Sequence, residues 1–254
     1  MESKLIVLTY HGIHDEESVG EADDPIYSLT KSEFSKQMDY LASLKYLKAT
    51  TFNNISSITD SSRIVVLTFD DGLASASSRI WPILLKRGLT AVFFISPALI
   101  GQKGYLKWDD VRAMSDEGAE FGTHGLYHKR FSELEDKELF EEIVDSKKNL
   151  QDKLKKPVLS LALPGGSMHP HALEIAKDAG YKYFCTSQRA INSLPLGFIV
   201  RRFPIKRSTP WCLFKATVLG NHTAEKVHHI IDNGKEFVKK AIPVFFSKIR
   251  TRIK

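Results

Sequence analysis

The sequence predicts one α/β domain whose strands are mostly parallel and form either a barrel or an open sheet. Its 254 residues, of which 43% are hydrophobic, are enough to bury one large core. Short runs rich in β-branched and aromatic residues alternate with longer helical patterns, as in a parallel sheet whose strands are joined by crossover helices. No internal repeat or low-complexity linker interrupts this alternation.

Seven apolar runs have the length and the composition of strands. They are Leu5–Tyr10, Ile64–Phe69, Thr90–Ile95, Ala119–Thr123, Val158–Leu163, Tyr181–Thr186 and Ile199–Pro204. Because parallel strands in such sheets all end at the same edge, we expect the chemistry of this protein to lie in the loops that follow them.

Helices are expected between most of these strands. Thr30 with Glu33, and Ser132 with Glu135, fit the pattern in which a hydroxyl and a carboxylate satisfy the free N–H groups of a helix start. The helices expected are about Thr30–Tyr46, Ala74–Arg87, Trp108–Glu117, Ser132–Lys155, His169–Ala179, Ala224–Ile231 and much of Lys235–Ile253.

The charge of the chain is concentrated at its C-terminal end. The formal net charge is +6, and residues 234–254 alone carry seven basic side chains against one acidic side chain. The remainder of the chain is therefore neutral, which argues against a surface that follows nucleic-acid phosphates. We expect two parts, a domain over residues 1–233 and a basic amphipathic segment over residues 234–254.

The basic segment mixes cations with apolar side chains such as Phe237 and Ile249. Two structures suit residues 235–254: a segment lying on an anionic membrane surface, where each basic residue contributes about 1 kcal/mol, or a last helix with a solvated basic face. No stretch predicts a signal peptide or a membrane span, so we expect a cytoplasmic protein, either free or peripheral at the inner face of the membrane. Cys185 and Cys212 lack a paired framework and are expected to be buried, reduced thiols.

The stretch LTFDDG, Leu67–Gly72, places two adjacent carboxylates, Asp70 and Asp71, at the end of a strand. His124 and His128 follow another strand and supply two imidazoles. Two imidazoles and one carboxylate oxygen make a three-ligand set that leaves positions open for water, as in catalytic divalent-metal sites. A cation held there would also relieve the repulsion between the adjacent carboxylates.

Three motifs make the chain similar to a known family. It resembles the polysaccharide deacetylase family, carbohydrate esterase family 4, whose T-F-D-D-G motif is matched by Thr68–Gly72. His124–His128 matches both histidines of its H-[ST]-x-x-H motif, with Gly125 at the hydroxyl position, and Ala162–Gly166 lies at its R-x-P-[YW]-G motif. The likeness covers about Leu5–Ile205 and implies a distorted (β/α)7-type barrel that forms a single catalytic domain.

The resemblance implies a hydrolase that removes an N-acetyl group from an acetylated sugar or glycan and releases acetate. Asp70 would be the catalytic base of this reaction. The metal ligands would be Asp71, His124 and His128. The family resemblance points to Zn²⁺, with Co²⁺, Ni²⁺ and Mn²⁺ as alternatives.

The third motif departs from the family at two side chains. The arginine that orients the base is replaced by Ala162, and the aromatic residue is replaced by Gly165, which follows Pro164. The amide of Gly165 still occupies the position of the oxyanion donor. Arg202, near the end of the last strand, is either a replacement that orients Asp70 or a plain surface or substrate-facing arginine.

The family's C-terminal L-x-H motif, whose histidine protonates the leaving amine, has no counterpart in this chain. His11, in LTYHGI after the first strand, resembles the early histidine of a subgroup of exopolysaccharide de-N-acetylases in which that residue is the general acid. The alternative for His11 is a structural role at a strand end, and His222 is a more distant candidate for the acid.

Other functions remain open at this point. The same centre would cleave an O-acetyl ester or a non-sugar amide. A protein of this fold that lost the arginine of the third motif would bind glycans without catalysis, although the complete set of two carboxylates and two histidines argues for an enzyme. A membrane-peripheral enzyme would suit a lipid-linked polysaccharide precursor as its substrate.

Overall fold

The computed structural model describes residues 4–15, 24–58, 63–228 and 230. The basic segment 234–254 and the expected domain boundary before it lie outside these residues. The structure therefore tests neither the expected helix nor the expected membrane contact there. None of the helices in the described ranges combines the length and the apolar character that a membrane crossing requires.

The secondary structure has the following bounds. The strands are β1 (Lys4–Tyr10), β2 (Ile13–His14), β3 (Leu29–Thr30), β4 (Leu47–Thr50), β5 (Arg63–Phe69), β6 (Val92–Ile95), β7 (Glu120–Thr123), β8 (Ser160–Ala162), β9 (Tyr183–Cys185), β10 (Asn192–Ser193), β11 (Ile199–Val200) and β12 (Phe203–Pro204). The α-helices are α1 (Lys31–Ser43), α2 (Trp81–Leu85), α3 (Trp108–Asp116), α4 (Asp136–Phe140), α5 (Ser146–Leu154), α6 (Ala172–Asp178) and α7 (Trp211–Val218). Wide π turns are η2 (Ala76–Ile80) and η5 (Glu141–Asp145), and short 3₁₀ turns are η1 (Ile55–Ser57), η3 (Pro97–Leu99), η4 (Phe131–Glu133) and η6 (Pro164–Gly166). Residues 222–228 are also helical.

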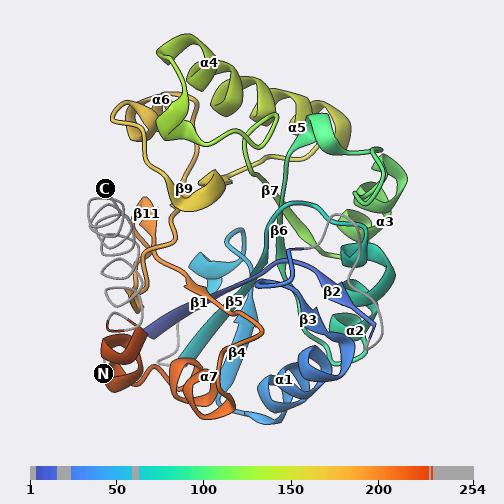
Figure 1. Cartoon of the computed structure of the whole chain (residues 1–254), viewed down its shortest axis with the longest axis vertical. Helices are drawn as coiled ribbons and strands as arrows, with labels where there is room; N and C mark the ends of the chain where they lie inside the picture. Colours follow the sequence, from blue (N-terminus) through green and yellow to red (C-terminus); the bar gives the residue numbers. More distant parts are fainter. Residues whose placement is uncertain (1–3, 16–23, 59–62, 229, 231–254) are drawn as a thin grey trace, which may run out of the picture.

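The large sheet is nearly closed into a barrel. Neighbouring strands follow the order β10-β1-β5-β6-β7-β8-β9-β11, and β12 pairs with β1. All of these pairings are parallel except that of β1 with β10. Figure 1 shows the helices arranged around the outside of the strands. The expected barrel of the (β/α)7 type is therefore confirmed, and the carboxyl ends of its strands meet at one rim.

The expected last strand, Ile199–Pro204, is interrupted in the structure. Its first part, β11, pairs with β9, whereas its second part, β12, pairs with β1. The expectation of one continuous strand was wrong because the two parts complete opposite edges of the nearly closed sheet. Arg202 lies in the break between them, and its side chain is buried.

The two predicted helix caps have different outcomes. At α1, the Glu33 amide donates to Thr30 Oγ1 at 3.2 Å and the Thr30 amide donates to the Glu33 carboxylate at 3.0 Å, as predicted. The prediction for Ser132 and Glu135 was wrong, because Ser132 lies in the turn η4 and α4 begins only after Glu135, without a side-chain cap. The buried ring of Phe131 fixes that turn against the core. Sequence reasoning also missed β4 and α7.

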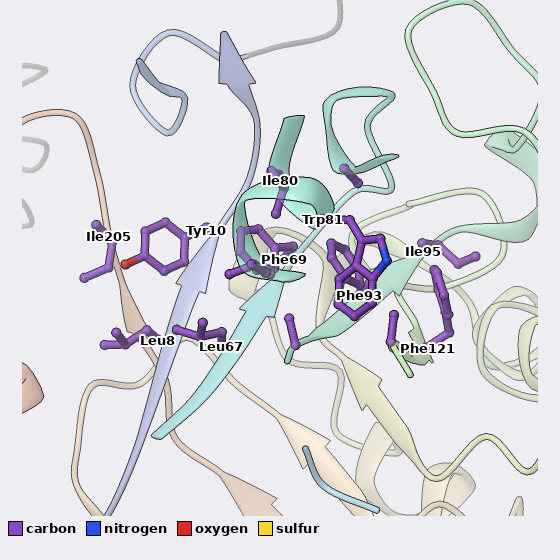
Figure 2. Packing of buried hydrophobic residues seen from close by; sticks show 14 of the residues in the cluster. Leu8, Tyr10, Leu67, Phe69, Ile80, Trp81, Phe93, Ile95, Phe121 and Ile205 are labelled. Atoms are coloured by element: carbon purple, nitrogen blue, oxygen red, sulfur yellow. The ribbon is translucent and has the colours of Figure 1, made fainter. Parts of the chain in front are cut away.

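A row of aromatic side chains crosses four neighbouring strands. Tyr10, Phe69, Phe93 and Phe121 are direct partners in the registers of β1, β5, β6 and β7. Their consecutive ring centroids lie 5.4, 5.1 and 5.7 Å apart, and Trp81 of α2 meets Phe93 edge on. Figure 2 shows this row packed beneath the helix layer. These rings bury the outer face of the strands close to the carboxyl rim.

The side chains that follow Tyr10 and Phe69 in the sequence point to the other face of the sheet. Successive side chains of a strand point to opposite faces. His11 follows Tyr10 and Asp70 follows Phe69, so both point away from the helix layer and toward the mouth of the barrel. The Asp70 amide donates to the Tyr10 carbonyl at 2.9 Å, which continues the pairing of β1 with β5 to the rim.

Both cysteines are free thiols, as expected. Cys185 is buried inside the barrel, and this burial raises the pKa of its thiol to about 12. Cys212 is exposed, which corrects the expectation that both are buried. The reason is helical periodicity, because α7 packs through Leu213, Phe214 and the residues one turn later, and Cys212 falls on its outer face.

Candidate active site

Asp71, His124 and His128 come together at the carboxyl rim of the barrel. Asp71 Oδ1 lies 3.4 Å from His124 Nε2 and 3.2 Å from His128 Nε2. His124 is buried, whereas the other two side chains are partly exposed and line the same cavity of about 510 Å³. The structure thus brings together the three residues that the sequence assigned to a divalent cation.

The surroundings of His124 fit a metal ligand. Its Nδ1 donates to the carbonyl of Ala162 at 2.8 Å, which orients the ring and directs Nε2 toward Asp71. Burial lowers the pKa of His124, but the carboxylates of Asp70 and Asp71 outweigh burial and raise this pKa overall. A site that attracts a proton to Nε2 in this way would equally attract a divalent cation, and imidazole nitrogens with a carboxylate oxygen are common ligands of Zn²⁺.

The backbone holds two of these ligands in an unusual conformation. Asp71 and His128 have φ angles of 74° and 63°, in the left-handed region that residues other than glycine rarely adopt. Such strain gathers at functional sites, where the surrounding structure enforces it. Burial opposes ionisation of Asp71, yet hydrogen bonds from His124 and His128 hold the pKa of its carboxyl well below the usual range.

Asp70 forms a buried ion pair with Arg202. The Arg202 guanidinium donates to Asp70 Oδ1 at 2.7 Å and to Oδ2 at 2.9 Å, and the two side chains are 1% and 5% exposed. Burial opposes ionisation of Asp70, but the charges of Arg202 and His124 and the hydrogen bonds from Arg202 together outweigh it, so the pKa of Asp70 is lowered. Asp70 Oδ2 lies 4.0 Å from His124 Nε2, which places an ionised carboxylate beside the ligand set.

Arg202 reaches this position from the break between β11 and β12. Its Nε donates to the Thr186 carbonyl at 3.1 Å, and its guanidinium lies 5.3 Å from the centroid of the Phe94 ring. The alternative of a surface arginine is excluded, because the side chain is almost completely buried. Ala162, which stands at the arginine position of the third motif, lies on β8 and turns its carbonyl to His124.

His11 lies in the same cavity, at the end of β1. Its ring contacts that of Tyr27 at 4.6 Å between centroids, with the two planes tilted by 37°, and its buried Nδ1 has no hydrogen-bond partner among the described residues. Burial lowers the pKa of His11, and the opposing charges of Asp71 and Asp70 only partly offset this. His222, the competing candidate, is exposed next to Glu225 and is absent from the described residues that line the cavity.

Gly165 also lines this cavity, within the turn η6. Its φ of 61° suits a glycine, and the preceding Pro164 is buried and fixes the entry to the turn. Gly165 therefore lines the same cavity as the candidate metal ligands, whereas Pro164 is absent from the described residues that line it. The role of the Gly165 amide as an oxyanion donor stays a prediction.

Glu142 is a residue that sequence reasoning missed. Its buried carboxylate accepts hydrogen bonds from the amides of Leu126 at 2.7 Å and Tyr127 at 3.1 Å, both in the loop between the two ligand histidines. A Cβ atom at Gly125, whose φ is 71°, would overlap Glu142 Oε2. This contact explains the glycine in the second motif. The sequence feature that could have indicated Glu142 is its position next to Ile143, on the apolar face of a helix, where a carboxylate is unusual.

A second group of two histidines and one carboxylate is formed by Asp136, His169 and His171. His171 Nδ1 lies 2.7 Å from Asp136 Oδ1, and His169 Nε2 lies 3.8 Å from the same oxygen. The His171 amide donates to His169 Nδ1 at 3.1 Å, so the proton of this ring is on Nε2. The nitrogen that faces Asp136 is therefore a donor, and this group does not fit a metal site as the first one does.

Comparisons with known proteins agree with this geometry. A family model described as Polysaccharide deacetylase matches residues 57–184, which is half of the chain. Protein YxkH of Bacillus subtilis (strain 168), a polysaccharide deacetylase by name, is 26% identical over 199 residues, which cover 77% of this chain and 68% of that protein. A peptidoglycan-N-acetylglucosamine deacetylase of Bacillus cereus is 29% identical over 126 residues, which cover 49% of this chain and 57% of that protein.

A solved structure has the same fold. The deacetylase PplD of Streptococcus pyogenes, in complex with acetate, superposes with a TM-score of 0.73 at 22% identity, over 82% of this chain and 95% of that one. The matching family model, the two relatives and the shared barrel all point to one group of proteins. The chain therefore belongs to the polysaccharide deacetylase family.

Proposed function

We propose that the chain removes an N-acetyl group from an acetylated sugar or glycan, with Asp70 as the general base and His11 as the general acid. The observation that supports this most directly is the Asp70 carboxylate, ionised by its pair with Arg202 and 4.0 Å from a candidate metal ligand. A general base needs to be ionised and close to the reacting groups. The lowered pKa of Asp70 supports the first property, and its position beside His124 of the candidate ligand set supports the second.

Asp71, His124 and His128 would hold the cation, Zn²⁺ in our proposal. When bound, a divalent cation supplies a Lewis acid that polarises the acetyl carbonyl and makes water easier to deprotonate. Arg202 has the role of a positioning residue, since both of its hydrogen bonds to Asp70 fix the direction of that carboxylate. The Gly165 amide would donate to the oxyanion.

The reaction has two proton transfers. Asp70 accepts a proton from water as its oxygen bonds to the carbonyl carbon. His11 then donates a proton to the leaving nitrogen as the C–N bond breaks, which gives a free amine and acetic acid, and the acid loses its proton to solvent as acetate. The lowered pKa of His11 makes its cationic form a ready donor. Asp70 returns its proton to solvent, and His11 is protonated again before the next turnover.

Two other functions have different support. The same residues would hydrolyse an O-acetyl ester or a non-sugar amide, although an ester has less need of the acid His11. The main argument for a glycan-binding protein without activity was the missing arginine of the third motif. The guanidinium of Arg202, bonded to both oxygens of Asp70, weakens that argument.

We also propose a lipid-linked polysaccharide precursor as the substrate and a cytoplasmic enzyme held at the inner face of the membrane. The support is the basic amphipathic composition of residues 235–254. Sedimentation with vesicles that contain anionic lipid, compared with neutral vesicles, tests the membrane contact. Equal recovery with both vesicle types would contradict it.

Acetate release is the experiment that tests the proposed activity. The protein loaded with Zn²⁺ is incubated with free and with lipid-linked acetylated sugars, and we expect equal amounts of acetate and free amine. Asp70→Asn is expected to lower kcat by at least about 100-fold, the contribution typical of a general base, with unchanged metal content. Asp116→Asn, an exposed substitution of the same kind on α3, is the matched control. A folded, metal-loaded protein that releases no acetate from any of these substrates would overturn the proposal.

A further inference from the structure

The cavity around the candidate metal site carries more positive charge than the proposed reaction needs. Besides Asp70 and Asp71, the described residues that line it include one carboxylate, Asp24, and three cations, Arg130, Arg189 and Lys206. Asp70 is already neutralised by Arg202. Arg130 and Lys206 have no part in the proposed reaction, and the uncharged hydroxyl and acetamide groups of a neutral glycan offer them no opposite charge.

Arg130 lies directly beside the oxyanion donor. A Cβ atom at Gly165 would be 3.1 Å from Arg130 Cγ and 3.2 Å from Arg130 Nε. The arginine side chain therefore covers the space where the family's third motif has an aromatic side chain. Its ion pair with Glu133 is loose, at 3.4 Å, and both side chains are more than 60% exposed, so solvent screens it. The guanidinium is consequently available to a ligand at the cavity wall.

Lys206 is a second cation, on the His11 side of the cavity. Its Nζ lies 4.6 Å from the centroid of the Tyr27 ring, and that ring contacts the ring of His11. Within the described ranges, Lys206 forms no ion pair with a carboxylate. Arg189 is buried and donates to the His228 carbonyl at 3.3 Å, so its guanidinium is already engaged.

We propose that the substrate is an acetylated sugar that carries an anionic group, either a carboxylate or a phosphate, and that Arg130 binds this group. A guanidinium suits both anions because its planar donors bind two of their oxygens at once. Lys206, which lines the same cavity, adds to the attraction. This inference rests on the proposed deacetylase function and adds to it a substrate class and a specificity residue.

Three matched monosaccharides test this inference. They are the methyl glycoside of N-acetylglucosamine, which is neutral, N-acetylglucosamine 1-phosphate and N-acetylmuramic acid, which carries a carboxylate. We expect kcat/KM to be at least about tenfold higher for one or both anionic sugars, as one charge-assisted contact provides, and the better of the two identifies the anion. In Arg130→Ala this preference should fall about tenfold, with partial retention in Arg130→Lys.

Lys129→Ala is the control, because it also removes one positive charge, next to Arg130 in the sequence. The Nζ of Lys129 pairs with Glu138, outside the cavity lining. It should leave the preference unchanged. A neutral sugar that is used as well as the anionic ones, or an Arg130→Ala variant that keeps the preference, would overturn the inference. Calorimetric binding of N-acetylglucosamine 1-phosphate to the wild type and to Arg130→Ala separates the two proposals. If no acetate is released from any sugar, the deacetylase function fails, and binding that depends on Arg130 still decides whether the cavity selects anions.

Discussion

The carboxylate of Glu142 accepts a hydrogen bond from the amide of Leu126 at 2.7 Å, and so ties a helix to the loop between two candidate metal ligands. Glu142 is 1% exposed, and it also accepts a hydrogen bond from the amide of Tyr127. In the family motif a small hydroxyl residue stands where this chain has Gly125. The glycine makes room for Glu142, whose carboxylate then holds the loop from the helix side.

Glu142→Ala is expected to lower the affinity for a divalent cation by about 10- to 100-fold, because outer partners that orient metal ligands typically contribute this much. Glu142→Gln keeps one oxygen acceptor for the loop amides and should lose less. Titration of Co²⁺ into the metal-free variants, followed by absorption, measures the effect without any substrate. Glu141→Ala removes the same charge from the adjacent residue and is the control. An unchanged Co²⁺ affinity in a folded Glu142→Ala variant would contradict the role of Glu142.

Arg202→Ala is expected to destabilise the protein by about 3–5 kcal/mol, since it leaves the buried charge of Asp70 without its partner. Arg202→Lys keeps a charge but loses the two-point contact, and is the variant for kinetics. With weaker support from residue 202, the pKa of Asp70 rises, so the base is ionised only at higher pH. The acidic limb of the kcat/KM profile should therefore move to higher pH. Arg201→Ala, an exposed neighbour, should leave the profile in place.

Glu120 lies at the opposite end of the barrel from the site, and its buried carboxyl should make the stability of the protein depend on pH. Burial raises the pKa of its carboxyl from 4.5 to about 7. A raised pKa means that the folded state binds the proton more tightly than the unfolded state. The stability that this proton provides is complete below about pH 4.5 and is lost as the pH rises through 7.

Glu120→Gln removes this loss because the amide is neutral at every pH. The variant should exceed the wild type in free energy of unfolding at pH 8, by at most about 3 kcal/mol, and match it closely at pH 5. Urea unfolding at the two pH values measures the difference. Glu174→Gln, an exposed carboxylate on α6, should show no such dependence on pH. A Gln variant that is less stable than the wild type at pH 8 would contradict the assignment.

Much of the barrel could be predicted because its strands are continuous apolar runs buried on both faces. The interruption at 199–204 could not, since it depends on which sheet edge each half meets after the barrel has nearly closed. The failed cap at Ser132 has a similar cause. Burial of Phe131 in the assembled core overrides a local hydrogen-bond pattern that favours an earlier helix start.

In the candidate site, too, some residues could be predicted from the sequence and others could not. Asp71, His124 and His128 are found by motif, because a ligand set needs those residue types at those strand ends. Arg202 could be suggested from sequence only as one of two alternatives, since its partner Asp70 is 132 residues away in the sequence. Glu142 was missed because its function is set by a loop that it meets only in the folded protein.

His11 has a role that depends on the leaving group. In His11→Ala, hydrolysis of an N-acetyl amide should fall at least about 100-fold, because an amine leaves only when its nitrogen is protonated. Hydrolysis of an O-acetyl ester should fall much less, since an alkoxide is the better leaving group. Acetate release from matched amide and ester substrates measures both. Tyr27→Phe keeps the ring that contacts His11 and is the control. Equal losses on the two substrates would contradict the acid role.

Removal of the cation should lower the melting temperature of the protein. The same measurement tests which of the two groups of two histidines and one carboxylate binds the cation. Added Zn²⁺ at 100 times its Kd would stabilise the folded state by about 2.7 kcal/mol. His128→Ala should abolish this gain, because it removes one of three ligands. His171→Ala should keep it, since hydrogen bonding places the proton of His169 on the nitrogen that faces Asp136. Loss of the Zn²⁺ effect in His171→Ala, with retention in His128→Ala, would move the metal site to the second cluster and remove the reason for placing a base at Asp70.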